Sequence, residues 1–274
     1  SFQSLGCDPS FAVGGALHET GTNAHHGSGD LFIAEADESD ASLLQYRASM
    51  AIVTNVEPDH LNFFGTPEAY CQVFADFLDC IDPAGSLIVC VDDPGSHTLA
   101  LYAVQKGIRV LGYGTAAAAA QAQRDGIPMA GGLEAWEPTL DGLVARIHLA
   151  GDDSPRELVL PVPGEHMALN ALAALIAVRD YGGDVSEALE ALTHFGGVNR
   201  RFQYHGHVGG IRVYDDYAHH PTEARAVLTA AREVADADAQ GLGHPGRVIV
   251  CFQPHLFSRT EQFAEEFAKA LDLA

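Results

Sequence analysis

Positively charged residues are scarce in this chain of 274 residues. Lys and Arg together number 15 against 37 Asp and Glu, so the formal net charge at pH 7 is −22. A field of this sign repels the phosphate backbone of nucleic acids and anionic membrane surfaces. We therefore exclude a general nucleic-acid binder, and we expect a few placed arginines or metal ions to receive any anionic substrate.

Cysteine pairs and long apolar runs are lacking as well. The 5 cysteines are odd in number and scattered, and none belongs to a C-x-x-C pair, so neither a disulfide framework nor a zinc site is expected. The longest helical apolar run, residues 171–178, is far shorter than the roughly 18 residues that cross a bilayer. These observations predict a cytoplasmic protein without a membrane partner, and they leave its oligomeric state open.

What the sequence does contain is an α/β pattern. Short β-rich runs alternate with helical patterns, which predicts βαβ units and a mostly parallel central sheet flanked by helices. The expected strands are residues 31–34, 51–54, 86–91 and 109–113, and the expected helices are residues 66–81, 95–106 and a segment from 165 onward. A hairpin is expected from residues 143–149 and 157–160. Residues 114–139 show no sustained period and are expected to form a poorly specified connector.

A second α/β unit is expected after the paired glycines at 196–197, which form a candidate hinge. Its predicted elements are strands at 211–214 and 247–252 and helices at 221–234 and 260–273. Two strands are too few for a doubly wound fold to be stable alone. We therefore expect this second unit to be incomplete within the chain.

Acidic and imidazole side chains follow two of the expected strands. Residues 35–40 read EADESD and residues 54–60 read TNVEPDH, each at the carboxyl end of a strand. Ligands of open α/β sheets collect at that end, and carboxylates supply the oxygen donors that divalent cations prefer. Adjacent strand ends would let these groups converge on one metal ion. An acidic helix start and a capped turn are the alternatives.

Two pairs of polar residues are candidates for contacts with a nucleotide. His166 and Asn170 lie one turn apart near the start of a predicted helix, where Asn is able to pair with an adenine edge and His to hydrogen-bond or stack. Arg200 and Arg201 concentrate cations beside the candidate hinge, and the guanidinium fork matches phosphate oxygens. Helix capping and an ordinary solvated surface are the alternatives for the two pairs.

Two further polar blocks follow the strands of the second unit. Residues 215–223 read DDYAHHPTE and residues 253–260 read QPHLFSRT, at the strand ends where riboses and reacting groups are commonly held. Arg259 in the second block is suited to a substrate carboxylate. An Asx turn with helix capping, and a solvated arginine at a helix start, are the alternatives.

Taken together, six motifs resemble those of the Mur ligases, and within them the branch that adds L-alanine. They are, in chain order, EADESDAS (35–42), TNVEPDH (54–60), GEHMALNALAA (164–174), FGGVNRRF (195–202), YDDYAHHPTEA (214–224) and QPHLFSRT (253–260). The resemblance spans nearly the whole chain. It implies that residues 1–196 are a central ATP-binding domain and that residues 197–274 begin a Rossmann-like C-terminal domain.

The resemblance also implies a reaction. ATP, with Mg²⁺ or Mn²⁺, phosphorylates the lactyl carboxylate of UDP-N-acetylmuramate, and the amine of L-alanine attacks the acyl phosphate to form an amide of a peptidoglycan precursor. Phosphorylation supplies the leaving group that a carboxylate lacks. The part of the protein is then to position the reactants and to neutralise charge.

Roles follow from the resemblance residue by residue. Glu35 and His60 match the metal ligands, and together with Arg201 and His219 they make up the implied catalytic set. Arg201 also reaches the terminal phosphate of ATP. The implied nucleotide contacts are His166, Asn170, Arg201 and Asp216, and the implied substrate contacts are Thr22, Asn23, Tyr217, His255 and Arg259.

Two departures from the family pattern bear on activity, beside smaller ones at Asn62, Met167 and Leu256. No G-x-x-G-K-[ST] phosphate loop occurs in it, and the N-terminal domain that holds the uridine diphosphate is missing. We therefore expect the full-length parent to be the enzyme and this chain alone not to turn over ATP. Two other functions stay open: a muropeptide-recycling ligase that adds a peptide to the same nucleotide-sugar, and a metal-dependent hydrolase built on Glu35, Asp37 and His60.

Overall fold

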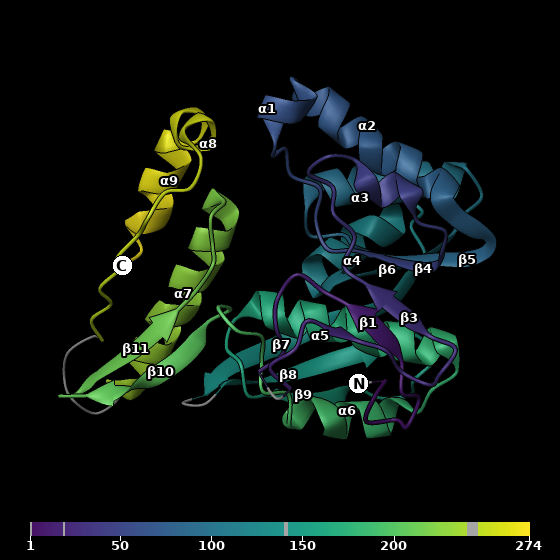
Figure 1. The fold of residues 1–274 in the computed structure, drawn as a ribbon. Coiled ribbons are helices and arrows are strands. Elements are labelled where there is room, and N and C mark those ends of the chain that lie inside the picture. Colours follow the sequence, from purple (N-terminus) through teal and green to yellow (C-terminus); the bar gives the residue numbers. More distant parts are fainter. Residues whose placement is uncertain (1, 19, 140–141, 240–245) are drawn as a thin grey trace.

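The computed structural model describes residues 2–18, 20–139, 142–239 and 246–274, and its largest element is a six-stranded sheet (Figure 1). In spatial order the strands are β4 (Ala48–Val53), β5 (Ile81–Cys90), β6 (Arg109–Thr115), β7 (Met129–Thr139), β8 (Gly142–Leu149) and β9 (Arg156–Leu160). The pairings from β4 to β7 are parallel, and those of β7 with β8 and β8 with β9 are antiparallel. The expected mostly parallel sheet and the expected hairpin are confirmed.

Helices cover both faces of this sheet. In chain order they are α2 (Pro67–Phe77), α3 (Pro94–Gln105), α4 (Ala116–Arg124), α5 (Glu165–Tyr181) and α6 (Val185–Thr193), with the shorter elements η1 (Ser42–Gln45), α1 (Leu61–Phe64) and η2 (Leu78–Cys80). The Thr66 side chain caps α2 by accepting a hydrogen bond from the Ala69 N–H, and Pro67 follows it. Proline fits the first helical position because its missing N–H would have no partner there.

The core divides at the sheet into two layers. Along β5, Leu87 and Val89 pack on the side of α2, α3 and α4, whereas Ile88 and Cys90 pack on the side of α5 and α6. This alternation is the period of two that a strand with both faces covered requires. The layers fix the position of β4, whose carboxyl end leads to the site residues Glu57, Asp59 and His60.

The expectation of a poorly specified connector at residues 114–139 is wrong. The alanine run forms α4, capped by Thr115, because alanine has the highest helix propensity. The strand β7 follows, and its small residues gave no β signal although they suit a strand beneath a helix. A Cβ at Gly131 would lie 3.0 Å from Leu172 of α5. Glycine here allows α5 to pack closely on the sheet.

A second, smaller sheet precedes the main one. It has the order β2-β1-β3, formed by β2 (Ala24–His25), β1 (Ser10–Ala12) and β3 (Phe32–Ala34). The predicted strand at 31–34 therefore exists as β3. The metal-site hypothesis assumed that it lies next to β4 in one sheet, but the two strands belong to different sheets. Period and composition predict a strand but not the sheet to which it pairs.

The C-terminal part begins with a hairpin rather than with parallel strands. It contains β10 (Gln203–Val208), β11 (Ile211–Asp215), α7 (Pro221–Asp238), α8 (Phe257–Gln262) and α9 (Ala264–Leu271), and β10 pairs antiparallel with β11. The predicted strand at 247–252 is not a strand, since no ladder forms along the described residues 246–256. A strand needs a hydrogen-bonded neighbour as well as apolar residues.

The predicted helix at 260–273 starts earlier and is interrupted at Phe263, so that it divides into α8 and α9. The helix predicted at 221–234 is confirmed as α7 and extends four residues further. In the described part of the chain, no helix combines the length and the apolar character that a bilayer crossing requires.

Candidate active site between the two lobes

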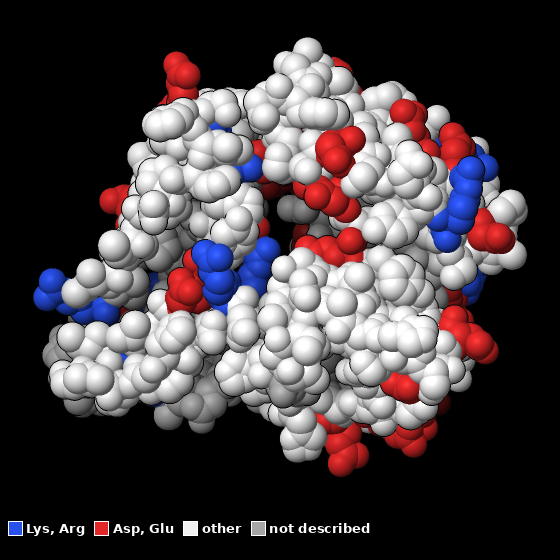
Figure 2. All heavy atoms as spheres, in the orientation of Figure 1, with Lys and Arg blue, Asp and Glu red and all other residues white. Residues whose placement is uncertain are grey.

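A cavity of about 660 Å³ lies between the large lobe, which runs from β1 to α6, and the C-terminal lobe, which runs from β10 to α9. Acidic atoms gather around the central hollow in Figure 2, and basic atoms lie beside it. Residues from both lobes line it, among them Glu35, Asp37, Glu38, Glu57, Asp59, His60, Arg201, Tyr217, His219, His220 and Glu223. The two acidic segments and the polar block at 215–223 thus share one site.

The small sheet fixes the position of Glu35. Because β1 and β3 are parallel and Ala12 lies opposite Ala34, the segments that follow the two strands run side by side. The Gly14 N–H donates a hydrogen bond of 2.6 Å to Glu35 Oε2. A Cβ at Gly14 would lie 3.0 Å from Glu35 Oε1, so glycine lets the carboxylate approach the backbone closely.

His60 has an unusual backbone conformation at the start of α1. Its φ is 52° and its ψ is 32°, in the left-handed region that residues other than glycine seldom adopt. Its N–H donates to Asp59 Oδ1 at 2.7 Å, and its Nε2 lies 3.7 Å from Glu38 Oε1. The imidazole therefore faces the acidic segment that follows β3, although β3 and β4 belong to different sheets.

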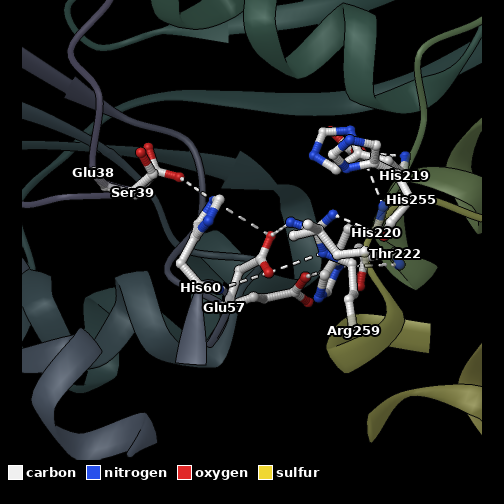
Figure 3. A network of polar contacts seen from close by, with 12 residues as sticks. Glu38, Ser39, Glu57, His60, His219, His220, Thr222, His255 and Arg259 are labelled. Atoms are coloured by element: carbon white, nitrogen blue, oxygen red, sulfur yellow. Dashed lines mark hydrogen bonds and ion pairs between the residues drawn. The ribbon is translucent and has the colours of Figure 1, made fainter. Parts of the chain in front are cut away.

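One ion pair and one histidine–carboxylate contact join the lobes beside His60 (Figure 3). Arg259 of α8 donates through Nε to Asp59 Oδ1 at 3.0 Å and through Nη2 to Asp59 Oδ2 at 2.9 Å. His220 Nδ1 lies 3.5 Å from Glu57 Oε2. Burial would raise the pKa of the Asp59 carboxyl, but the hydrogen bonds from Arg259 and from the His60 amide outweigh burial and lower that pKa.

The structure does not leave Arg259 open to a substrate carboxylate, as the sequence reading expected. Its side chain is 3% exposed and its guanidinium is already paired with Asp59. The residue does not border the cavity. Sequence reasoning placed Arg259 correctly near the site, but it had no means of finding a partner 200 positions away.

Arg201 is delivered to the cavity by a strained loop. Arg200 and Phe202 on either side of it have φ values of 62° and 47°. Asp216 stabilises this loop by accepting the Phe202 N–H at 2.7 Å. The Arg201 side chain is 47% exposed, and its Nη1 lies 3.3 Å from Glu223 Oε1. A strained backbone persists only where surrounding contacts hold it, and such positions cluster at functional sites. The conformation of this loop therefore supports a functional role for Arg201.

Three aromatic side chains of the C-terminal lobe lie close together. His219 Nδ1 is 2.9 Å from the Tyr217 carbonyl oxygen, and the rings of these residues are 5.0 Å apart. Since a carbonyl only accepts, Nδ1 carries the proton and Nε2 is the ring nitrogen that is free to accept one. Tyr217 and His219 line the cavity. His255 is exposed and does not line it, and its ring lies 6.4 Å from that of His219.

Of the residues expected to contact a nucleotide, Arg201 lines the cavity, whereas His166, Asn170 and Asp216 are not part of its lining. Gly164 has a φ of 103°, and a Cβ there would meet the His166 ring at 2.7 Å, so glycine makes room for the imidazole. Burial lowers the pKa of His166, and the charges of Asp216 and Arg201 act on it. Burial likewise raises the pKa of Asp216. Asn170 is exposed one turn further along α5.

Thr22 and Asn23 are not brought to the cavity. Their backbone carbonyls accept hydrogen bonds from Leu17 and Val13, at 3.0 and 2.9 Å, and so close the loop between β1 and β2. Thr22 Oγ1 bonds to Thr20 Oγ1. A contact of these two residues with the nucleotide-sugar stays a prediction.

The donor set in the cavity suits a hard divalent cation. Among the described residues, no group of three or more His, Cys, Asp or Glu side chains is arranged to hold a metal. Mg²⁺ is usually bound by one or two protein ligands together with substrate phosphates, and Glu35 and His60, which both line the cavity, fit that mode. Nitrogen is the less preferred donor for Mg²⁺ and is well accepted by Mn²⁺.

The sequence reading did not select several residues that shape the site. Asp59, Glu57, His220, Glu223 and Gly14 all line the cavity. Four of them lie within motifs that the sequence already singled out. For Asp59, Glu57 and His220 the missing information was their contact with the other lobe, for which a single sequence carries no local signal.

The comparisons with known proteins define the class. The Mur ligase middle domain family matches residues 16–178, and the Mur ligase glutamate ligase domain family matches residues 200–274. The chain therefore belongs to the Mur ligase family.

Individual relatives narrow the likeness. The chain is 56% identical over 286 residues to the UDP-N-acetylmuramate–L-alanine ligase of Rhodococcus jostii, with 100% of this chain and 57% of that protein covered. The ligase of the same name from Nocardia farcinica is 54% identical, with 55% of its length covered. The crystal structure of UDP-N-acetylmuramate–alanine ligase MurC from Thermotoga maritima matches with a TM-score of 0.75 and 28% identity, over 100% of this chain and 55% of that one. The chain thus spans little more than half the length of these relatives.

Proposed function

We propose that the full-length protein containing this chain is an ATP-dependent ligase that joins L-alanine to UDP-N-acetylmuramate in the synthesis of peptidoglycan precursors. The cavity between the lobes is the observation that carries this function, because it sets carboxylates and an imidazole opposite an arginine and a second histidine. The whole-chain identity to ligases named for this reaction supports the choice of substrates.

Charge neutralisation is the proposed role of Glu35, His60 and Arg201. Glu35 and His60 would hold Mg²⁺ or Mn²⁺, which when bound neutralises phosphate charge and orients ATP. Arg201 would receive the terminal phosphate, since its guanidinium is half exposed at the cavity. His166, Asn170 and Asp216 would hold the adenosine end of ATP, beside the cavity.

The reaction needs two displacements. First, a carboxylate oxygen of UDP-N-acetylmuramate attacks the γ-phosphorus of ATP, and ADP leaves. The amine of L-alanine then attacks the acyl carbon, the bond between this carbon and the phosphate oxygen breaks, and phosphate leaves. The amine must lose a proton as the amide forms. His219 Nε2 is the proposed acceptor of that proton, because the Tyr217 carbonyl holds the ring proton on Nδ1. Tyr217 and His255 would contact the incoming amino acid.

We also propose that the chain divides into two domains between residues 196 and 197. The large lobe would be the ATP-binding domain, and the C-terminal lobe would be the start of the Rossmann-like domain. The phosphate loop is absent from the 274 residues, so the activity is proposed for the longer protein. The five cysteines are all free, which fits a reducing cytoplasm.

The test is a product assay with the purified full-length protein. With ATP, Mg²⁺, UDP-N-acetylmuramate and L-alanine we expect one ADP for each UDP-N-acetylmuramoyl-L-alanine, measured by liquid chromatography and mass spectrometry. Exchanging L-alanine for a muropeptide-derived peptide should abolish the product. Preferred incorporation of the peptide, or metal-dependent ester hydrolysis without nucleotide, would refute the proposed function.

A further inference from the structure

Among the residues that the structure describes, Asp59 and Arg259 form the most completely buried ion pair between the lobes. The two side chains are 16% and 3% exposed, and both carboxylate oxygens of Asp59 accept from the guanidinium, at 3.0 and 2.9 Å. The remaining Nη1 donates to the His255 carbonyl oxygen at 3.4 Å. A bidentate pair of this kind fixes the orientation of the carboxylate as well as its distance from the guanidinium.

The same carboxylate also controls the backbone of His60. Asp59 Oδ1, which accepts from Arg259 Nε, accepts the His60 N–H at 2.7 Å. His60 is held at a φ of 52°, where a non-glycine residue is strained and persists only if neighbouring contacts hold it. A chain of contacts therefore runs from Arg259 of α8, through Asp59, to His60, whose imidazole faces Glu38. Figure 3 shows the two ends of this chain, Arg259 and His60.

We propose that Arg259 and Asp59 are positioning residues, which orient His60 in the cavity only while the two lobes are in contact. Arg259 then acts through Asp59 and not on the substrate. Separation of the lobes removes the guanidinium, frees the Asp59 carboxylate and releases the His60 backbone from its strained conformation. The catalytic consequence rests on the proposed function, whereas the structural coupling does not.

The competing role for Arg259, as receptor of a substrate carboxylate, is disfavoured by burial. An incoming carboxylate would have to displace Asp59, and an unpaired buried carboxylate carries a large desolvation penalty. Arg201 is 47% exposed at the same cavity and is able to receive an anion without breaking a buried pair.

Kinetics of the full-length protein separate the two roles. If Arg259 positions His60, Arg259→Lys and Asp59→Asn each lower kcat about 10²-fold, the scale expected when a reacting group is misplaced by about 1 Å. KM for L-alanine stays near the wild-type value, and the double variant is no worse than either single one because both act along one route. The matched control is Arg212→Lys, whose Arg is paired with Asp238 at 2.7 Å in the same lobe and lies outside the cavity lining.

Hydrogen exchange followed by NMR tests the coupling without an activity assay. In the wild-type protein the His60 amide is expected to be protected, because Asp59, which accepts it, is held by Arg259 while the lobes are in contact. In Arg259→Lys the His60 amide is expected to exchange about ten- to hundredfold faster, because a rise of this size corresponds to losing the hydrogen bond from this amide to the charged Asp59 carboxylate. The α3 amides of the large lobe should be unchanged, which checks folding.

Two results would overturn the positioning role. One is a large rise in KM for L-alanine at unchanged kcat in Arg259→Lys, with Asp59→Asn unaffected, which would assign Arg259 to the amino acid. The other is a His60 amide in the wild-type protein that exchanges as fast as an unprotected loop. Failure of the wild-type protein to form the alanyl product refutes the proposed function instead and leaves the exchange result to decide the coupling.

Discussion

Replacing Gly14 by alanine should impair the site without unfolding the protein. The added Cβ would lie 3.0 Å from Glu35 Oε1 and 3.2 Å from Oε2, so the carboxylate must move by a few tenths of an ångström. Glu35 is able to give way because its carboxylate is the end of a flexible side chain. A displacement of about 1 Å at a catalytic group costs roughly 10²-fold in rate, so we expect kcat/KM to fall about tenfold for this smaller shift.

The assay is the rate of ADP release by the full-length protein at varied UDP-N-acetylmuramate, alongside thermal unfolding. Stability should not fall, because glycine-to-alanine exchange at an unstrained position restricts the unfolded chain and contributes roughly 0.4–1 kcal/mol in favour of folding. Gly132→Ala is the matched control, since its added Cβ would meet nothing nearer than the Gly114 carbonyl at 3.9 Å. Wild-type kcat/KM in Gly14→Ala would refute the claim that Gly14 sets the position of Glu35.

Two further predictions concern stability. Leu172→Ala, at a fully buried position of α5, should lower the free energy of unfolding by about 2–5 kcal/mol in urea denaturation. The control Leu273→Ala, at a 38% exposed position, should lower it by less than about 1 kcal/mol. Equal losses in the two variants would contradict the placement of the core. Burial lowers the pKa of His166 from its ordinary 6.5, so below that pH the unfolded chain binds a proton that the folded chain does not, and stability falls as the pH falls. His166→Gln should therefore lose less stability than the wild type between about pH 7 and about pH 5.5, and parallel losses would show that His166 is not buried as a neutral group.

Local signals in the sequence predicted most of the main sheet. Thr66 and Pro67 predicted the start of α2 because capping depends on neighbours in sequence. The apolar run at 86–91 predicted β5 because both of its faces are buried. These elements depend on residues only a few positions apart, so their patterns are visible in one chain.

Elements that depend on distant partners were missed. The strand β7 contains the small residues Ala130, Gly131 and Gly132 near its start. What makes it a strand is its pairing with β6 and β8 and the packing of α5 on Gly131. Conversely, residues 247–252 have a strand-like composition but no ladder among the described residues. Pairing partners override propensity in both cases.

The candidate site shows the same division. The motifs located Glu35, His60, Arg201 and His219 at strand ends and loops that the structure brings to one cavity. From the sequence, Arg259 was expected to bind a substrate carboxylate. Its true partner, Asp59, lies 200 positions away, and no local pattern reveals a contact over that separation. Strand-end placement is local information, whereas the contact between the lobes is not.

The central claim is that Glu35 and His60 share one divalent cation at the seam between the lobes. The most direct measurement is anomalous X-ray diffraction from crystals of the full-length protein grown with Mn²⁺ and a non-hydrolysable ATP analogue. We predict an anomalous peak in the cavity, within bonding distance of the Glu35 carboxylate and the His60 imidazole and in contact with a phosphate oxygen. A manganese ion bound to the nucleotide that touches neither Glu35 nor His60 would contradict the claim.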